Sequence, residues 1–161
     1  MWKVSISGLS VWKRRRASNE REGHGKEMTR REIREHVFVL LFQGEFYDAA
    51  EVEAQNGLYF ENFVESASEE EIEYIVGRFA RVRENYGTID ALLAEATSGW
   101  KLSRMGKVEL SLLRLAVFEM NCDEEIPGKV AINEAVELAK KFGGDASYGF
   151  VNGVLAKLAR E

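Results

Sequence analysis

The 161-residue sequence predicts an all-α protein with about seven helices in a single compact unit. Its apolar residues recur at close to 3.6 residues in every periodic segment, and none of these segments shows the sustained alternation of a β-strand. The chain holds a single proline, and 45% of its residues are hydrophobic and 30% charged, which is typical of a globular domain. Its apolar runs are far shorter than the roughly 20 residues that cross a bilayer, so we expect no membrane-spanning helix.

Two capping boxes mark helix starts in the first half of the chain. Thr29 with Glu32, and Ser68 with Glu71, have the spacing in which a hydroxyl and a carboxylate cap each other's backbone amides. We predict a first helix after Thr29, a second over about 51–65 and a third from residue 69 that Gly87 ends. An aromatic stripe on the first helix comprises Phe38, Phe42 and Phe46.

The sequence pattern of the second half of the chain predicts four further helices. A short helix begins at Thr88, and residues 100–105 connect it to the most apolar segment, 108–120, which we expect to be a buried centre. Residues 129–142 form the next helix, which Gly143 and Gly144 stop in the manner of a C-cap. The last helix spans about 147–160.

Charge is distributed unevenly along the chain. Residues 1–27 hold seven Lys or Arg and three Glu, a net charge of +4, and include the basic run 13–16. The rest holds fifteen basic and twenty-four acidic residues, a net charge of −9. We interpret 1–27 as a disordered basic extension or an upstream read-through of a true start at Met28, and 28–161 as the helical domain. An acidic body binds nucleic acid only through a localised basic patch.

No constellation of catalytic residues is recognisable. The sequence contains no GxGxxG loop, no nucleophile elbow and no histidine or cysteine pair at metal-ligand spacing. A single cysteine, Cys122, is typical of a reducing cytoplasmic setting. We therefore expect a cytoplasmic protein that is not an enzyme and that uses neither a metal nor a cofactor.

Two segments are candidates for contact with RNA. Arg30, Arg31 and Arg34 cluster at one helix start, where they suit phosphates, although they could instead pair with neighbouring glutamates. In the glycine-rich corner at 142–150, Lys141 and its neighbour Lys140 precede Tyr148 and Phe150, the mixture that unpaired bases and phosphates require. The alternative is a core position for Phe150 and a purely capping role for the glycines.

Several motifs, in matching order and spacing, resemble the NusB family of bacterial transcription antitermination factors. The strongest are KVAINEAVELAKKFG at 129–143 and FVNGVL at 150–155. RR at 30–31, RE at 34–35, WKLSRM at 100–105 and LRLA at 113–116 support them. The resemblance covers about residues 28–160. It implies two small packed helical bundles and an RNA-binding role.

The resemblance also implies partners and their contact residues. Family members bind the boxA element of nascent ribosomal RNA leaders together with the small-subunit ribosomal protein NusE, and the RNA polymerase that carries this complex resists termination. By motif, the expected RNA-binding residues are Arg30, Arg31, Arg34, Lys141, Tyr148 and Phe150, and the expected NusE-binding residues are Phe42, Phe46 and Glu109. Glu134 and Asn152 are expected to fix local structure. Gly149 departs from the family, which often has a basic residue there, so one phosphate contact is expected to be missing.

Three alternatives stay open at this point. The helical module of a ribosomal RNA methyltransferase has a similar sequence, although the chain leaves no room for a catalytic domain. A protein-binding scaffold that never touches RNA would suit the net charge of −9. A homodimer that buries Phe42 and Phe46 would explain exposed aromatic residues at helical spacing.

Overall fold

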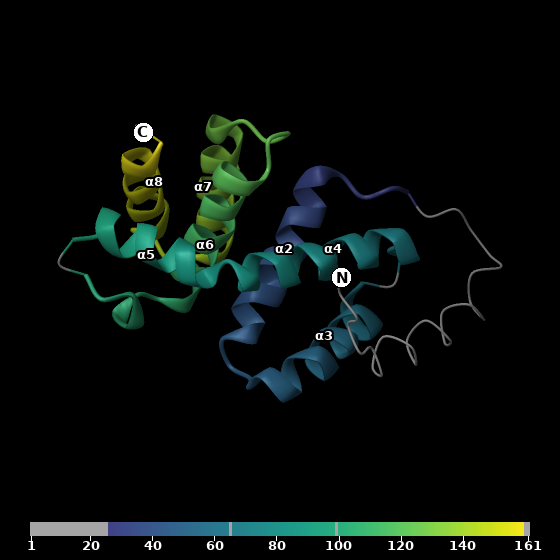
Figure 1. Ribbon diagram of the computed structural model, residues 1–161. Coiled ribbons are helices and arrows are strands. Elements are labelled where there is room, and N and C mark those ends of the chain that lie inside the picture. Colours follow the sequence, from purple (N-terminus) through teal and green to yellow (C-terminus); the bar gives the residue numbers. More distant parts are fainter. Residues whose placement is uncertain (1–25, 65, 99, 160–161) are drawn as a thin grey trace.

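The computed structural model describes residues 26–64, 66–98 and 100–159, which fold into helices (Figure 1). These residues contain seven α-helices, one short 3₁₀-helix and no β-strand, which confirms the predicted class. The predicted extension lies largely outside the described residues and remains a prediction. In chain order the elements are α2 (Arg30–Gly44), α3 (Ala49–Phe63), α4 (Glu69–Glu84), α5 (Tyr86–Ala96), η1 (Leu102–Arg104), α6 (Lys107–Cys122), α7 (Gly128–Phe142) and α8 (Ser147–Leu158).

The helices form the two packed bundles that the family resemblance implies. In Figure 1, α2, α3 and α4 lie on one side of the molecule and α5 to α8 lie on the other. Helix α2 packs against α4 within its own bundle and against α6 of the second bundle. Helix α6 also packs against α5, α7 and α8. Helices α2 and α6 therefore join the bundles.

Helix boundaries follow from capping side chains. Both predicted capping boxes form, at Thr29 and at Ser68. A third box that we did not predict forms at Asp48, so α3 begins two residues earlier than expected. Gly87 does not end the third helix as predicted: α4 stops two residues before Tyr86, and Gly87 lies inside α5. Asn85 makes this break, because its side-chain amide donates to the Arg81 carbonyl oxygen at 2.7 Å.

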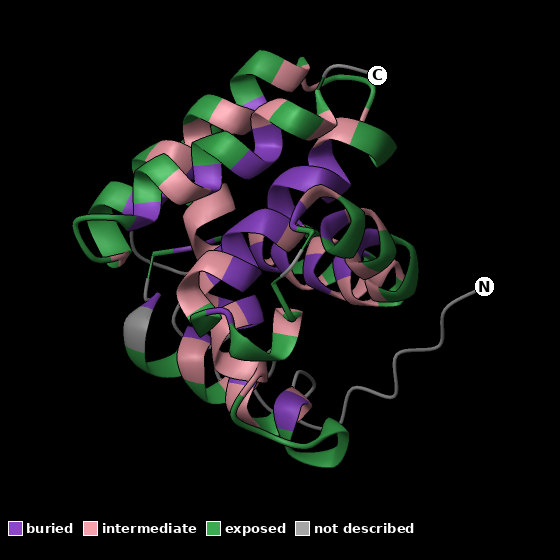
Figure 2. Cartoon of the chain, turned by 90° about the vertical axis from the view of Figure 1, so that its left-hand side faces the viewer, coloured by how far each residue is buried: buried purple, intermediate pink, exposed green. Residues whose placement is uncertain are grey.

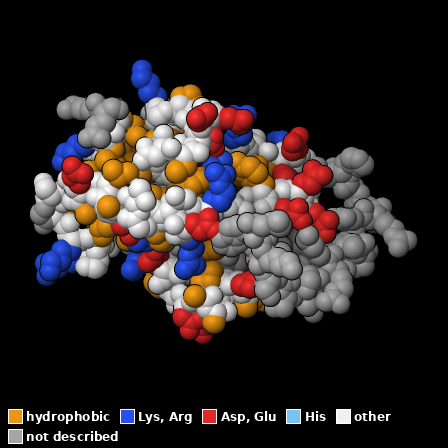
Figure 3. All heavy atoms as spheres, in the orientation of Figure 1, with side chains coloured by type: hydrophobic (Ala, Val, Ile, Leu, Met, Phe, Trp, Pro, Cys, Tyr) orange, Lys and Arg blue, Asp and Glu red, His pale blue; other side chains and the backbone are white. Residues whose placement is uncertain are grey.

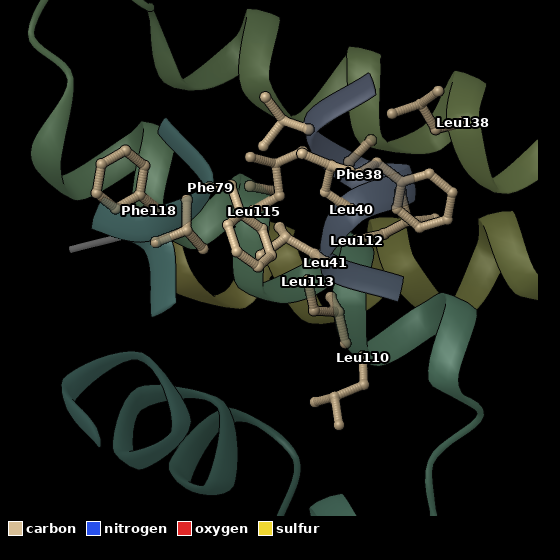
Figure 4. Packing of buried hydrophobic residues seen from close by; sticks show 14 of the residues in the cluster. Phe38, Leu40, Leu41, Phe79, Leu110, Leu112, Leu113, Leu115, Phe118 and Leu138 are labelled. Carbon is tan, nitrogen blue, oxygen red and sulfur yellow. The ribbon is translucent and has the colours of Figure 1, made fainter. Parts of the chain in front are cut away.

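Helix α6 is the buried centre, as the sequence predicts. Its apolar side chains pack against α2 and α4 (Figure 4), and the buried residues gather in the interior of the molecule (Figure 2). Each fully buried leucine or phenylalanine contributes about 1.5–3 kcal/mol to folding. The largest buried side chains of α2 and α6 are Phe38, Leu40, Leu41, Leu112, Leu113 and Phe118.

Two properties of the described residues bear on membrane insertion and on metal binding. None of their helices is both long enough and apolar enough to cross a membrane. Within the same residues, no three His, Cys, Asp or Glu side chains lie together in a group that could hold a metal ion. Cys122 is exposed and reduced at the end of α6.

Candidate RNA-binding surface

The structure divides the arginine cluster at the start of α2 into two exposed side chains and one that is largely covered. Arg30 is exposed and forms no ion pair with another described residue. Arg31 keeps 64% of its side chain exposed, while its Nε and Nη2 atoms donate to Glu134 at 3.0 and 2.8 Å. Arg34 has only 10% of its side chain exposed and donates through Nε to Glu119 at 2.8 Å. Two of the three guanidinium groups are therefore accessible to a ligand.

Glu134, on α7, orients Arg31. The hydrogen bond from Arg31 lowers the pKa of Glu134, although partial burial of the carboxylate opposes this, and the same bond raises the pKa of Arg31. Both groups are consequently charged at neutral pH, in a two-point arrangement that fixes the plane of the guanidinium. A guanidinium has five N–H donors, and this pair uses two of them, so three remain for a phosphate.

The Arg34–Glu119 pair is buried between α2 and α6. Burial raises the pKa of Glu119, and the hydrogen bond and charge of Arg34 act in the opposite direction. Glu119 has 5% of its side chain exposed, so its charge depends on this partner. Nη1 of Arg34 also lies 3.6 Å from Glu134. Arg34 thus holds the base of the cluster in place and presents little of itself to a ligand.

A hollow with a volume of about 650 Å³ opens beside the cluster. It is bounded by the start of α2, by Tyr74 and Arg78 of α4 and by the connection between α6 and α7. Arg78 donates to Tyr74 Oη at 2.6 Å and to Asp123, so the wall on this side is held by hydrogen bonds. Its size is in the range of ligand-binding pockets, and its lining mixes apolar and charged groups. Apolar lining residues include Ile33, Val37, Leu115, Ile126, Pro127 and Val130.

The glycine-rich corner places basic and aromatic side chains together, as predicted. Lys141 is exposed and pairs with Glu35 of α2, with Nζ 2.6 Å from Oε1. Tyr148 is exposed, and its ring lies 5.6 Å from Nζ of Lys140. Phe150 is half-buried: it packs against the core and also contacts the ring of Trp100, centroid to centroid at 6.1 Å.

Helix α7 connects the arginine cluster to this corner. Glu134 and Lys141 lie seven residues, or two helical turns, apart on α7, a rise of about 10 Å. Both contact α2, through Arg31 and Glu35 respectively. The arginine cluster and Lys141 therefore lie along the same line of contact between α2 and α7. On the face that Figure 3 shows, basic and acidic side chains are interspersed.

The residues expected to bind NusE also differ in exposure. Phe42 is half-buried, and Phe46, in the turn after α2, is 61% exposed; their rings meet edge to face at 5.2 Å. They form a small apolar surface at the end of α2 opposite the arginines. Glu109, in the first turn of α6, accepts a hydrogen bond from the hydroxyl of Ser147 at the start of α8. Its carboxylate therefore ties two helix starts together.

Gly143 determines how closely α8 follows α7. A Cβ added to Gly143 would lie 2.5 Å from Cβ of Ser147 and 2.7 Å from the Ala139 carbonyl oxygen. We expect Gly143→Ala to lower the free energy of unfolding by about 1–3 kcal/mol, because backbone must shift to relieve the contact. A Cβ on Gly144 would meet no atom within 4 Å, so Gly144→Ala should change stability by less than about 0.5 kcal/mol. Urea unfolding measures both, and equal decreases would contradict this role for Gly143.

Two residues of this site, Glu119 and Trp100, are not predicted from the sequence. Residues 110–120 contain only two charged side chains, Arg114 and Glu119. A charge in an otherwise apolar helix is a signal of a buried ion pair, and this signal could have identified Glu119. The second is Trp100, which the sequence marks only as part of the motif WKLSRM at 100–105. Its side chain is 62% exposed beside Phe150, which the sequence gives no means of anticipating.

The fold and this surface define a class of protein: two packed helical bundles, with arginines at the first helix start and a basic, aromatic corner connected to them by α7. The NusB family model matches residues 31–160. The chain belongs to the NusB family.

Similarity to individual family members extends over nearly their whole length. The chain is 57% identical over 131 residues to the transcription antitermination protein NusB of Lachnoclostridium phytofermentans, covering 81% of this chain and 98% of that protein. It is 48% identical over 132 residues to the protein of the same name from Agathobacter rectalis, covering 82% and 100%. Among solved structures, T. maritima NusB superposes with a TM-score of 0.73 at 32% identity, covering 84% of this chain and 94% of that one. A chain from a crystal structure of the antitermination factors NusB and NusE in complex with double-stranded RNA has the same fold, with a TM-score of 0.66 at 23% identity, covering 80% and 94%.

Proposed function

We propose that the chain is a bacterial transcription antitermination factor that acts in the cytoplasm by binding and not by catalysis. It binds single-stranded boxA-type RNA together with the ribosomal protein NusE, as part of the antitermination complex of RNA polymerase. The observation that carries the proposal is that α7 aligns exposed Lys141 with exposed Arg30 and Arg31 along α2, while Lys141 leads into the corner that holds Tyr148 and Phe150. Relatives that match over nearly their full length bear the corresponding name.

RNA binding in an acidic protein requires a preformed local site. Arg31 is already oriented by Glu134, so it loses little conformational freedom when a phosphate takes up its remaining donors. Tyr148 and the exposed edge of Phe150 supply faces on which unpaired bases stack. The surrounding negative charge repels RNA elsewhere, so binding is confined to this surface.

NusE is proposed to dock at the opposite end of α2. Phe42 and Phe46 supply adjoining aromatic area that is only partly buried in the free protein. Glu109 contributes negative potential toward a basic subunit while its bond to Ser147 holds the carboxylate in place. Arg30 and Arg31 lie at the other end of α2 from Phe42 and Phe46, whereas Glu109 borders the glycine-rich corner through Ser147, so the proposed RNA and NusE surfaces adjoin there.

The test is the affinity for RNA of an Arg30→Ala/Arg31→Ala variant, measured by fluorescence anisotropy with NusE saturating. A hydrogen bond to a charged group contributes about 1.5–3 kcal/mol, so we expect each substitution to weaken binding by roughly ten- to a hundredfold. The salt dependence should flatten by about 0.7 in slope for each phosphate that the variant no longer neutralises.

Arg83→Ala is the matched control. It removes one positive charge, as Arg30→Ala and Arg31→Ala each do singly, but Arg83 packs beside Gly44, at the far end of α2, about 20 Å from Arg30 along the helix. We expect its RNA affinity to equal that of the unmodified protein. If both variants bound RNA equally weakly, binding would reflect net charge alone, and the proposal would fail.

A protein-binding scaffold is the second candidate, favoured by the ion pairs that occupy Arg31 and Arg34. A scaffold keeps its affinity for NusE and shows no selective RNA binding before or after the double substitution. The same titrations therefore separate the two functions.

A further inference from the structure

The connection between α5 and η1 contains an exposed aromatic residue that the proposed RNA site does not use. Trp100 has 62% of its side chain exposed, the largest exposed fraction among the exposed large hydrophobic side chains of the described residues. Its backbone amide donates to the Thr97 carbonyl oxygen at 2.8 Å, so the turn that carries it is closed by a hydrogen bond. The backbone that carries the indole is thus held by the fold.

The indole continues the aromatic surface of the glycine-rich corner. Its ring contacts that of Phe150, with the centroids 6.1 Å apart and the planes inclined at 54°. Phe150 itself packs against the core. The two rings therefore form one aromatic pair, in which Phe150 belongs to the proposed RNA site and Trp100 is the more exposed member.

The segment that carries Trp100 is basic in a protein whose body is acidic. Residues 97–107 contain Lys101, Arg104 and Lys107 and no acidic residue. Lys107 pairs with Glu45, but Lys101 and Arg104 are exposed and form no ion pair with another described residue. An exposed indole followed by two unpaired cations is the combination that binds a base and the phosphates beside it.

We propose that Trp100 is a second base-stacking residue, and that Lys101 and Arg104 bind the adjacent phosphates of single-stranded RNA. The proposal rests on the RNA-binding function proposed above and extends the RNA path beyond Phe150 to the connection between α5 and η1. Stacking on an indole accepts any base, so this subsite adds affinity and length of footprint more than sequence selectivity.

Tryptophan fluorescence tests the contact directly in the full-length chain. The protein has three tryptophans, and Trp2→Phe/Trp12→Phe leaves Trp100 as the sole emitter. We expect single-stranded boxA-type RNA, added to this protein with NusE bound, to quench the emission in parallel with binding measured by anisotropy. NusE alone should leave the emission unchanged. If NusE alone quenches Trp100, or if RNA binds without quenching it, the proposal is wrong.

Affinity provides the second measurement. Stacking on an aromatic side chain contributes about 1–3 kcal/mol per base, so Trp100→Ala should weaken RNA binding by roughly five- to a hundredfold, whereas Trp100→Phe should retain most of the affinity. Leu58→Ala, which removes another exposed apolar side chain from α3, is the control and should have no effect. Unchanged affinity in Trp100→Ala overturns this inference alone, whereas failure of the unmodified protein to bind RNA overturns the proposed function.

Discussion

Replacing Arg34 with alanine is expected to lower the free energy of unfolding by about 3–5 kcal/mol, a large share of the stability of a domain of this size. The substitution would strand the carboxylate of Glu119, which has 5% of its side chain exposed, without the guanidinium that donates to it at 2.8 and 3.2 Å. Urea unfolding followed by circular dichroism measures the decrease. Arg34→Glu, which would place a second carboxylate there, should be more damaging still.

Arg30→Ala is the control for this prediction. Arg30 lies one turn away on the same helix but is exposed, so its removal should change stability by less than about 0.5 kcal/mol. Replacing both members of the buried pair, as Arg34→Leu/Glu119→Leu, should restore much of the stability, because no charge is then left buried. If Arg34→Ala were no more destabilised than Arg30→Ala, the ion pair would not support the fold.

The pH dependence of the Arg34→Ala variant has a definite sign. Burial already raises the pKa of Glu119, and the substitution of Arg34 removes an effect that lowers it. A carboxyl group whose pKa is higher in the folded state than in the unfolded state favours folding as the pH falls toward that pKa. The stability deficit of Arg34→Ala should therefore be greatest at neutral pH and should shrink as the pH is lowered toward 5. A deficit that grows on acidification would contradict this account of Glu119.

Arg114→Ala should be comparably destabilising, by about 3–5 kcal/mol, because Arg114 joins three parts of the fold. Its Nε and Nη2 atoms donate to Asp90 of α5 at 2.9 Å each, and Nη1 donates to Glu45 in the turn after α2. Its guanidinium also lies 4.0 Å from the ring centroid of Tyr86, whose pKa burial raises to about 12. Arg114 has 11% of its side chain exposed, Glu45 18% and Asp90 30%, so the network is partly shielded from water.

Two variants make the Arg114 prediction specific. Arg114→Lys keeps the charge but cannot reproduce the two parallel hydrogen bonds to Asp90, so it should recover only a small part of the stability. Lys107→Ala removes the other cation at Glu45, which is 44% exposed and 3.5 Å away, and should cost at most about 1 kcal/mol. Amide hydrogen exchange should show α5 losing protection in Arg114→Ala. Full protection of α5 would mean that the network does not hold this helix.

Most of the fold could be predicted because the relevant signals are local. Capping boxes and 3.6-residue periodicity involve residues within one or two turns of each other, and they place the first helix start and the buried α6 correctly. The prediction that Gly87 ends a helix is wrong because, although glycine commonly ends helices, Asn85 provides the hydrogen bond that ends α4 here. The early start of α3 was not predicted, although Asp48 and Glu51 have capping-box spacing.

The sequence predicts which residues belong to the candidate site, but it does not predict where their side chains point. The arginines are recognisable from sequence, yet their partners Glu134 and Glu119 are 103 and 85 residues away. Whether an arginine points outward or into a buried pair depends on these distant acids, which local spacing does not reveal. For this reason Arg34, expected to contact RNA, proves to be positioned against α6, whereas Arg30 and Arg31 remain at the surface.

The division between Arg30, Arg31 and Arg34 changes how mutations in this helix are interpreted. Weaker RNA binding in an Arg34 variant has two explanations. The variant loses either the fold that supports the site or a side chain that binds phosphate. Substitutions at Arg30 and Arg31 avoid this ambiguity, since both side chains are exposed.

The central claim is that this chain recognises a particular RNA jointly with NusE. The most direct measurement is an anisotropy titration of fluorescent boxA-type RNA, and of a scrambled RNA of equal length, with and without NusE at two salt concentrations. We predict tighter binding with NusE present and a preference for the boxA-type sequence that persists at the higher salt, because screening weakens the binding of phosphates but not the recognition of base edges. Equal affinity for both RNAs, falling together as salt rises and unaffected by NusE, would contradict the claim.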